Sequence, residues 1–169
     1  GNKVLRATGY QAKYPTLAGR FPINPNKVYL LELVARKVTG SSIIYGIITF
    51  YTASGAAIAA STTWTSRNGT NHYFPSGVLP ATSWTRYATK MGAGQTGFII
   101  PSNAAYFGLS GLWNYTGPGT DVVEVGLFRV VDAVDGELIV DGSVTANHLT
   151  AGSVTAGKIA AGAIVANDI

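Results

Sequence analysis

The sequence predicts an all-β protein, a jelly-roll β-sandwich followed by a C-terminal extended repeat segment that trimerises. Three observations lead to this prediction. Of the 169 residues, 47% are hydrophobic, 12% are charged and 21 are Gly, a composition that is typical of β-rich proteins rather than helical bundles. Short stretches with strand-like alternation recur between Gly and Pro turns over residues 1–133. Residues 142–169 then repeat with a period close to ten.

The strongest predicted strand is KVYLLELVARKV, residues 27–38. Successive side chains of a strand point to opposite sides of the sheet, so alternate positions share a face. The apolar face of this strand comprises Tyr29, Leu31, Leu33 and Ala35. We expect this face in the core.

The next predicted strand, SSIIYGIITFY at 41–51, follows a turn at Gly40. One of its sides carries Ile44, Ile48 and Phe50, and the other carries Ile43, Tyr45, Ile47, Thr49 and Tyr51. Because both sides are rather apolar, we expect this strand in the middle of a sheet.

About nine short strands without a helical period predict a sandwich, and the alternation of strands and turns favours a jelly roll. The further strands are expected at 4–8, 71–74, 84–90, 96–100, 104–113 and 122–131. TASG at 52–55 and GAGQTG at 92–97 are expected to be turns. GAGQTG is not expected to bind phosphate, because it lacks the Lys and the following helix of a phosphate-binding loop. Trp84 is expected in the core.

The repeat segment, assigned to 134–169, contains GSVTANHLTA, GSVTAGKIAA and a partial GAIVANDI. Three columns stay apolar, and a fourth changes freely. The apolar columns are Val144, Val154 and Ile164, then Ala146, Ala156 and Ala166, then Leu149, Ile159 and Ile169; the variable column is His148, Lys158 and Asp168. About three small apolar side chains per unit are too few to offset backbone ordering at ~1 to 2 kcal/mol per residue.

We therefore expect neighbouring chains to supply the missing packing, with three chains around an axis. Whether each unit is a strand and turn or a short helical turn stays open. The alternative for the whole segment is a flexible linker of Gly, Ala, Ser and Thr, but a linker has no reason to keep its apolar residues in register.

Residue types exclude most catalytic and metal sites. The chain has no Cys and two His, His72 and His148, which cannot complete a tetrahedral zinc shell. Neither His lies in a nucleophile motif such as G-x-S-x-G, so a serine triad is not indicated. Glu32 is the single acid among the first 120 residues, whereas a glycosidase needs two carboxylates about 5 to 10 Å apart. Asp121 and Glu124 could approach it, but we expect a solvated loop acid and a sheet residue. No enzyme activity is predicted.

The charge is uneven along the chain. Residues 1–90 hold ten Lys or Arg against one acid, a net charge of +9, and residues 91–169 hold two against seven, a net charge of −5. The basic half could meet a polyanionic glycan; the alternative is a solvated surface. Nucleic acid is not expected because the charges are scattered, and no apolar run is long enough for membrane insertion.

Five segments in order resemble the carbohydrate-binding-module jelly roll of the galactose-binding-like type. They are FPINPNKVYLLELVARKVTG, IITFYTASGAAI, TSWTRYATKM, AAYFGLSGLW and DVVEVGLFRVVDA, and they cover residues 20–133. The resemblance implies a sugar-binding sandwich over 1–133. It also implies that Glu124 stands where relatives support a structural calcium, although the usual paired acid is missing here, so no cofactor is expected.

The segment DGELIVDGSVTANHLTAGSVTAGKIAAGAI resembles repeats of tailed-phage host-specificity and tail-fibre proteins. This resemblance implies a phage tail-tip location in the virion, passage through the host cytoplasm during assembly, a homotrimer built by the repeats, and other tail proteins as neighbours.

Sugars are held by aromatic rings that stack on their C–H faces and by polar donors to their hydroxyls. WTSRNGTNHYF at 64–74 and LWNYTG at 112–117 place aromatic residues beside Asn and Arg. The candidate stacking residues are Trp64 and Trp113, then Tyr73 and Tyr115; the candidate donors are Arg67, Asn71 and Asn114; Arg36 and Tyr45 are expected to line the non-core face of a sheet. The alternative for each Trp is a place in the core.

Three hypotheses follow. In the first, the chain is a non-enzymatic phage tail module whose sandwich binds bacterial surface glycan and whose repeats build a trimeric shaft. In the second, the sandwich is a tail spacer or decoration without a ligand. In the third, it is a carbohydrate-binding module appended to a secreted enzyme.

Overall fold

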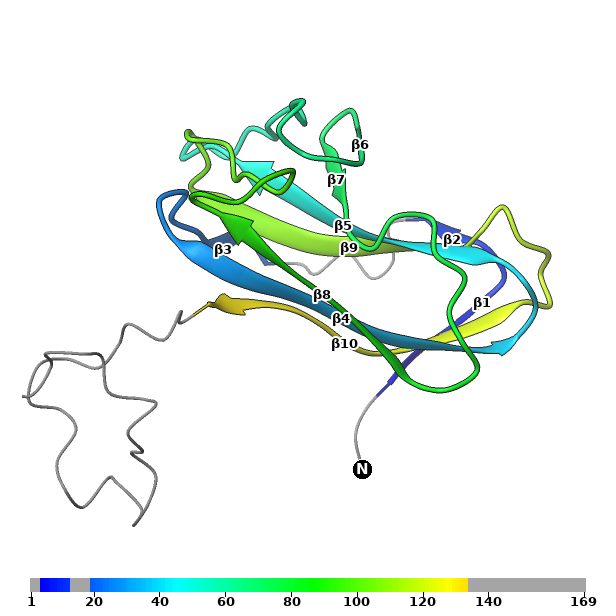
Figure 1. Ribbon diagram of the computed structural model, residues 1–169. Helices are drawn as coiled ribbons and strands as arrows, with labels where there is room; N and C mark the ends of the chain where they lie inside the picture. Colours follow the sequence, from blue (N-terminus) through cyan, green and yellow to red (C-terminus); the bar gives the residue numbers. More distant parts are fainter. Residues whose placement is uncertain (1–3, 13–18, 134–169) are drawn as a thin grey trace, which may run out of the picture. The chain divides into compact units, whose positions relative to one another are not determined.

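The computed structural model describes residues 4–12 and 19–133, which form a sandwich of two antiparallel sheets (Figure 1). The strands are β1 (Leu5–Thr8), β2 (Gln11–Ala12), β3 (Phe21–Pro22), β4 (Val28–Thr39), β5 (Ile43–Tyr51), β6 (Arg67–Asn68), β7 (Asn71–Tyr73), β8 (Thr85–Gly92), β9 (Tyr106–Tyr115) and β10 (Val122–Asp132). No helix occurs within the described ranges, so none there could cross a membrane. The predicted all-β sandwich is confirmed. The predicted repeats and their trimerisation lie outside the described residues.

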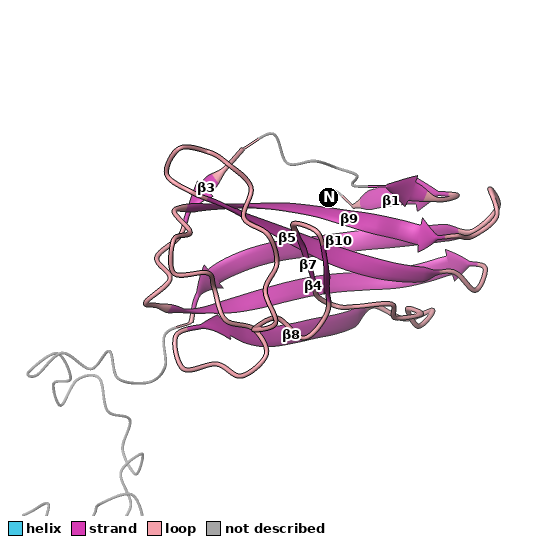
Figure 2. Cartoon of the chain, turned by 90° about the horizontal axis from the view of Figure 1, so that it is seen from above, coloured by secondary structure: helices cyan, strands magenta, loops and turns pink. Residues whose placement is uncertain are grey.

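Sheet A has the strand order β1-β10-β4-β8, and sheet B has the order β2-β9-β5-β7-β6, with β3 also paired to β9. The five long strands alternate between the sheets along the chain: β4, β8 and β10 belong to sheet A, and β5 and β9 belong to sheet B. Figure 2 shows them running nearly alongside one another, as expected for two sheets packed face to face. β5 lies between β9 and β7, so its predicted mid-sheet position is confirmed.

The core fills the space between the two sheets. The predicted inner face of β4 is buried, with Tyr29 at 8% exposure and Leu31, Leu33 and Ala35 at 0%. The side of β5 that carries Ile44, Ile48 and Phe50 is equally buried, because each of these residues is 0% exposed. Phe128 of β10 packs against both of the hydrophobic clusters that make up the core.

The predicted strand at 96–100 does not form a ladder. Only Phe98 in this stretch makes a bridge, to Trp64. GAGQTG forms the expected turn, in which the Gln95 amide donates to the Gly92 carbonyl at 3.2 Å. The apolar residues that follow it serve packing instead, since the Phe98 ring lies 5.1 Å from the Trp64 ring and Ile100 is 2% exposed.

The prediction for Trp84 is wrong, because this side chain is 43% exposed on the outer face of sheet A. Strand parity explains its position. Tyr87 packs against the core and Met91 is completely buried, so residues an odd number of positions away from them point outward. Trp84 shares the outward parity of Arg86, which pairs with Glu32 on that face.

Two tryptophans give a matched stability test. Trp113 is 1% exposed between the sheets, so Trp113→Ala should lower the free energy of unfolding by about 3 to 5 kcal/mol, the usual cost of the cavity left by a large core side chain. The chemically identical change Trp84→Ala should cost less than about 1 kcal/mol, because the ring is exposed. Urea unfolding of both variants measures the difference, and equal losses would contradict the assignment of core and surface.

Candidate functional site

The outer face of sheet B carries a row of four tyrosines, Tyr10, Tyr115, Tyr45 and Tyr73, named here the tyrosine row. Neighbouring ring centroids lie 5.5, 5.2 and 5.2 Å apart in that order, and each pair meets edge to face. Tyr45 belongs to β5, Tyr73 to β7 and Tyr115 to the end of β9, so three adjacent strands supply three of the rings, and Tyr10 lies in the turn between β1 and β2. Edge-to-face packing stabilises aromatic pairs and fixes their orientation. The row is therefore a preordered aromatic surface.

Strand parity places the Tyr45 ring outside the core. Ile44 and Ile48 of β5 are completely buried between the sheets, so Tyr45, next to Ile44 in sequence, points to the opposite side. Tyr45, Tyr73 and Tyr115 are half-buried by one another and by the sheet, whereas Tyr10 is 45% exposed. Part of each ring is thus available to a ligand.

A polar hollow of about 290 Å³ adjoins the row at Tyr115. It is lined by Ser41, Ser42, Ile43, Tyr115, Thr116, Gly117 and Pro118. Side-chain hydroxyls and peptide groups surround this hollow, and both kinds of group bond to sugar hydroxyls. The hollow therefore supplies polar partners beside an aromatic ring, which is the usual composition of a small-ligand site.

The backbone at Tyr115 adopts an uncommon conformation. Asn114 and Thr116, on either side of it, have φ angles of 51° and 57°, in the left-handed region that a β-branched residue such as Thr rarely occupies. Such strain is retained where the surroundings enforce it, and it is frequent at binding sites. Here it sets the direction in which the Tyr115 ring leaves the end of β9.

Asn114 is the residue that enforces this geometry. It was predicted to donate to a sugar, but it is 2% exposed. Its Nδ2 donates to the carbonyls of Ala7, Gly9 and Asp121 at 3.0, 3.0 and 3.1 Å. The side chain therefore joins β1, β9 and β10 at this end of the sandwich and has no donor directed toward solvent.

Trp64 and Trp113, predicted to stack on sugars, both lie in the core. Trp64 is 0% exposed, and its Nε1 donates to the Tyr73 carbonyl at 3.1 Å. The Trp64 ring packs edge to face against Phe50 of β5 and against Phe98 of the segment between β8 and β9, so a strand and a loop both cover it. Neither indole presents a face to solvent, so the tyrosine row, and not these tryptophans, is the candidate surface for stacking on a sugar.

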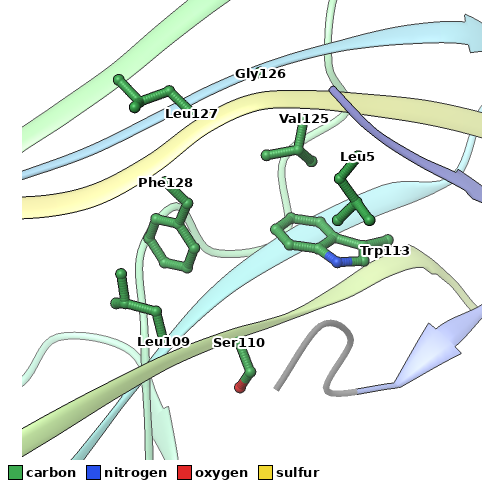
Figure 3. A pocket seen from close by; sticks show the side chains of 8 residues that line it. All are labelled: Leu5, Leu109, Ser110, Trp113, Val125, Gly126, Leu127 and Phe128. Atoms are coloured by element: carbon green, nitrogen blue, oxygen red, sulfur yellow. The ribbon is translucent and has the colours of Figure 1, made fainter. Parts of the chain in front are cut away.

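Trp113 lines an apolar pocket of about 160 Å³ between the sheets (Figure 3). Figure 3 shows Leu5, Val125, Phe128, Leu109 and Trp113 pointing toward one another, while Ser110 points away. A pocket lined in this way is part of the core, because it offers a sugar no polar side chain to bind.

The remaining predicted residues are divided between surfaces. Asn71 and Tyr73 are two positions apart on β7 and share a face, so Asn71 joins the tyrosine row. Arg67 pairs with His72 in the ladder and therefore points to the other side of the hairpin; its Nη1 donates to the Trp64 carbonyl at 2.8 Å. Arg67 is exposed but lies apart from the row.

Arg36 and Tyr45 were predicted to line the non-core face of one sheet; both lie on non-core faces, but on different sheets. Arg36 lies on the outer face of sheet A, where it binds Glu124, whereas Tyr45 lies on the outer face of sheet B. The core separates the two side chains. The sequence analysis also missed Tyr10, which lies between β1 and β2. The one signal in the sequence is an aromatic residue directly after a Gly at the end of a predicted strand.

The described acids are held by hydrogen bonds and ion pairs. Oε1 of Glu32 accepts from Arg86 at 2.5 to 2.6 Å, and Oε2 accepts from Arg129 at 2.7 Å. The hydrogen bond from Arg129 lowers the pKa of Glu32 from its ordinary 4.5, although burial acts in the opposite direction. Asp121, predicted to be a solvated loop acid, is instead 4% exposed, and bonds from Ser42 lower its pKa.

Glu124, at the position where the family resemblance implies calcium, is bound by two arginines. Its carboxylate accepts from Arg6 and from Arg36, each at 2.8 Å, and the bond from Arg36 lowers its pKa. Two guanidinium groups beside one carboxylate disfavour a divalent cation. Within residues 4–12 and 19–133, no group of three or more His, Cys, Asp or Glu is placed to bind a metal.

His72 is 1% exposed and packs between the rings of Phe50 and Trp64. Its Nδ1 lies 3.2 Å from the Ile48 carbonyl, so this nitrogen carries the proton in the neutral ring. Burial lowers the pKa of His72 from 6.5, and the carbonyls of Ile48 and Thr70 oppose that shift. This histidine is a core residue.

Comparisons with known proteins give structural neighbours only. No family model matches the sequence, and no curated protein matches it. A "Family 16 Carbohydrate Binding Module-2" is 12% identical with a TM-score of 0.44, and 78% of each chain is covered. A structure titled "CBM4 structure and function" is 7% identical with a TM-score of 0.45, and 76% of this chain and 82% of that chain are covered.

The "enzymatically active domain" of Bacteriophage CBA120 tailspike protein 4 is 12% identical with a TM-score of 0.41, and 75% of this chain and 17% of that chain are covered. None of these similarities assigns the chain to a family. The structural neighbours are carbohydrate-binding modules and a phage tailspike domain.

Acid should destabilise the protein in two steps. A histidine whose folded pKa is lowered takes up its proton only on unfolding, so stability should fall as the pH drops below about 6.5. Carboxylates with lowered folded pKa values then lose their contribution below about pH 4.5. Urea midpoints measured from pH 7 to 3 should show both steps. In His72→Gln the upper step should vanish and the lower step remain; an unchanged upper step would contradict the role of His72.

Proposed function

We propose that this chain is a non-enzymatic module of a phage tail tip or tail fibre, and that it contributes to host-cell attachment by binding a bacterial surface glycan. The observation that carries the proposal is the tyrosine row, which places four aromatic rings in contact on one outer face. In this proposal the protein works in the virion, beside other tail proteins, after assembly in the host cytoplasm.

The chemistry of the row suits a neutral sugar chain. The ring face of a pyranose is made of C–H groups and packs on an aromatic ring, while its hydroxyls need hydrogen-bonding partners. Tyr45 and Tyr115 supply adjacent rings, 5.2 Å apart between centroids. Their phenol groups, the Asn71 amide and the polar hollow at Ser41 and Thr116 supply the partners.

We propose no glycoside hydrolysis because the buried carboxyl groups of the described residues lack the properties of a catalytic general acid. A general acid in a glycosidase needs a raised pKa. Among the described residues, Glu32, Asp121 and Glu124 have lowered pKa values, and Asp132 lies at the exposed end of β10 in an ion pair of 3.5 Å with Lys27. None of the three carboxylates with lowered pKa values is suited to donate a proton near pH 7.

The assignment to a phage tail is supported by the phased repeats. Val144, Val154 and Ile164 keep one register while neighbouring columns vary. We propose that residues 134–169 assemble three copies of the chain and so bring three sandwiches together, which would raise the avidity of a weak sugar site.

The tyrosine row is tested by Tyr45→Ala and Tyr115→Ala. Each should weaken binding to the best neutral oligosaccharide on a glycan array, and to host cells, about tenfold or more, because stacking surface is lost. Trp84→Ala, on the opposite sheet, is the control and should bind this neutral sugar as the unchanged protein does. If the unchanged protein binds no glycan and no cells, the ligand-free spacer hypothesis replaces this one.

The trimer is tested by light scattering of the full chain and of a chain that ends at residue 133. The full chain should have the mass of three copies at micromolar concentration, because the repeats have too little apolar surface to fold alone. The shortened chain should be smaller. A full-length monomer would contradict the proposed fibre segment.

A further inference from the structure

The outer face of sheet A, opposite the tyrosine row, holds a second exposed aromatic residue in a hollow. The hollow has a volume of about 360 Å³ and is lined by Val4, Val34, Trp84, Gly126 and Leu127. We name these five residues the Trp84 shelf. Trp84 is 43% exposed and Val4 is 44% exposed, so the shelf opens to solvent. Nothing in the core requires a tryptophan at this position.

A β-bulge makes room for the indole. The register between β10 and β4 shifts between Val125 and Leu127, which leaves Gly126 without a partner in β4. A Cβ at Gly126 would lie 3.2 Å from ring carbon Cζ3 of Trp84. The missing side chain therefore lets the ring lie close to the strand, and Arg36 stacks on it with Cζ 4.8 Å from the ring centroid.

Two ion-pair clusters flank the shelf. Arg6 and Arg36 bind Glu124 at one end, and Arg86 and Arg129 bind Glu32 at the other. Four arginines against two glutamates leave a net charge of +2 (4 − 2) in these clusters.

Exposure decides which sign of charge a ligand meets. The four arginine side chains are 39 to 58% exposed, whereas the two glutamate side chains are 4 and 8% exposed. The carboxylates thus lie beneath the guanidinium groups and hold them in place. The bonds to Glu32 use Nε and Nη2 of Arg86 and of Arg129, and each guanidinium has five N–H donors, so donors remain beyond those in the ion pairs.

We propose that the Trp84 shelf is a second carbohydrate site, specific for sugar chains that carry carboxylates, such as uronic acid polymers. The Trp84 ring stacks on the C–H face of one sugar, and the exposed guanidinium groups on both sides bind its carboxylate and those of its neighbours. Charge-assisted bonds from arginine to carboxylate are short and directional. A neutral sugar would lack a carboxylate to pair with the exposed arginines, so it should bind this site more weakly.

Other occupants fit less well. A second copy of the chain would bring two faces of the same positive sign together, which is unfavourable. Single-stranded nucleic acid is bound by several successive aromatic rings along a basic groove, whereas the shelf holds one, Trp84. The site is separate from the tyrosine row, since it lies on the other sheet, and each of the two proposals can fail without the other.

The test is calorimetric titration of the full chain with oligogalacturonide, which has pyranose rings and carboxylates. We expect saturable binding that weakens as salt rises. Trp84→Ala should lower the affinity about tenfold or more. Gly126→Val retains the indole and every charge but fills the floor of the shelf, and it should cause a similar loss. Thermal unfolding of each variant checks that the sandwich is intact.

Three controls make the outcome decisive. Leu79→Ala should bind oligogalacturonide normally, because this side chain is exposed and lies outside both proposed sites. A neutral malto-oligosaccharide should show no dependence on Trp84, and polyphosphate, which has charge but no sugar ring, should compete poorly. The proposal is overturned if the unchanged protein does not bind oligogalacturonide, if folded Trp84→Ala and Gly126→Val bind as well as the unchanged protein, or if polyphosphate or single-stranded DNA displaces the sugar at equal charge concentration.

Discussion

The ladder between β4 and β10 is the constraint on which the other described features depend. It joins residues far apart in the chain, with Leu33 opposite Phe128 on the core side and Glu32 opposite Arg129 on the outer side. Because one register fixes both faces, the same pairing that buries Leu33 also places Arg129 beside Glu32. Of the two register shifts in this ladder, the one at Gly126 is the place where Trp84 lies. The register of this ladder thus determines the packing of Leu33 in the core, the ion pair at Glu32 and the position of the exposed Trp84 ring.

Alternation within a strand was predictable from sequence, because it depends on neighbouring residues alone. It placed Leu31 and Leu33 inside and separated Tyr45 from Ile44 correctly. The three tryptophans were not predictable in this way. Whether a ring is buried depends on the register of β8, on the loop that folds Trp64 over Phe50, and on Gly111, where a Cβ would lie 2.1 Å from the Trp113 ring. All three depend on tertiary structure, which the local sequence does not contain. For this reason Trp84 was predicted to be buried although it is exposed.

The candidate site shows the same division between local and tertiary information. Tyr73 and Tyr115 were proposed because Asn and Arg lie near them in sequence, and Tyr45 because of its expected place on a non-core face. Their contact requires the strand order β7-β5-β9, which no local pattern contains. Asn114 has the residue type of a sugar donor, yet its amide bonds three carbonyls inside the protein. The uneven charge was visible in the sequence, whereas the burial of Glu32 and Glu124 beneath exposed arginines was not.

The two exposed aromatic surfaces point in opposite directions, one from each sheet. A rigid body of this kind cannot lay both against one flat cell wall. If both proposed sites bind sugar, they can be occupied together only where polymer strands pass on either side of the domain. Because the two surfaces share no residue, each bound strand would be released and rebound independently of the other.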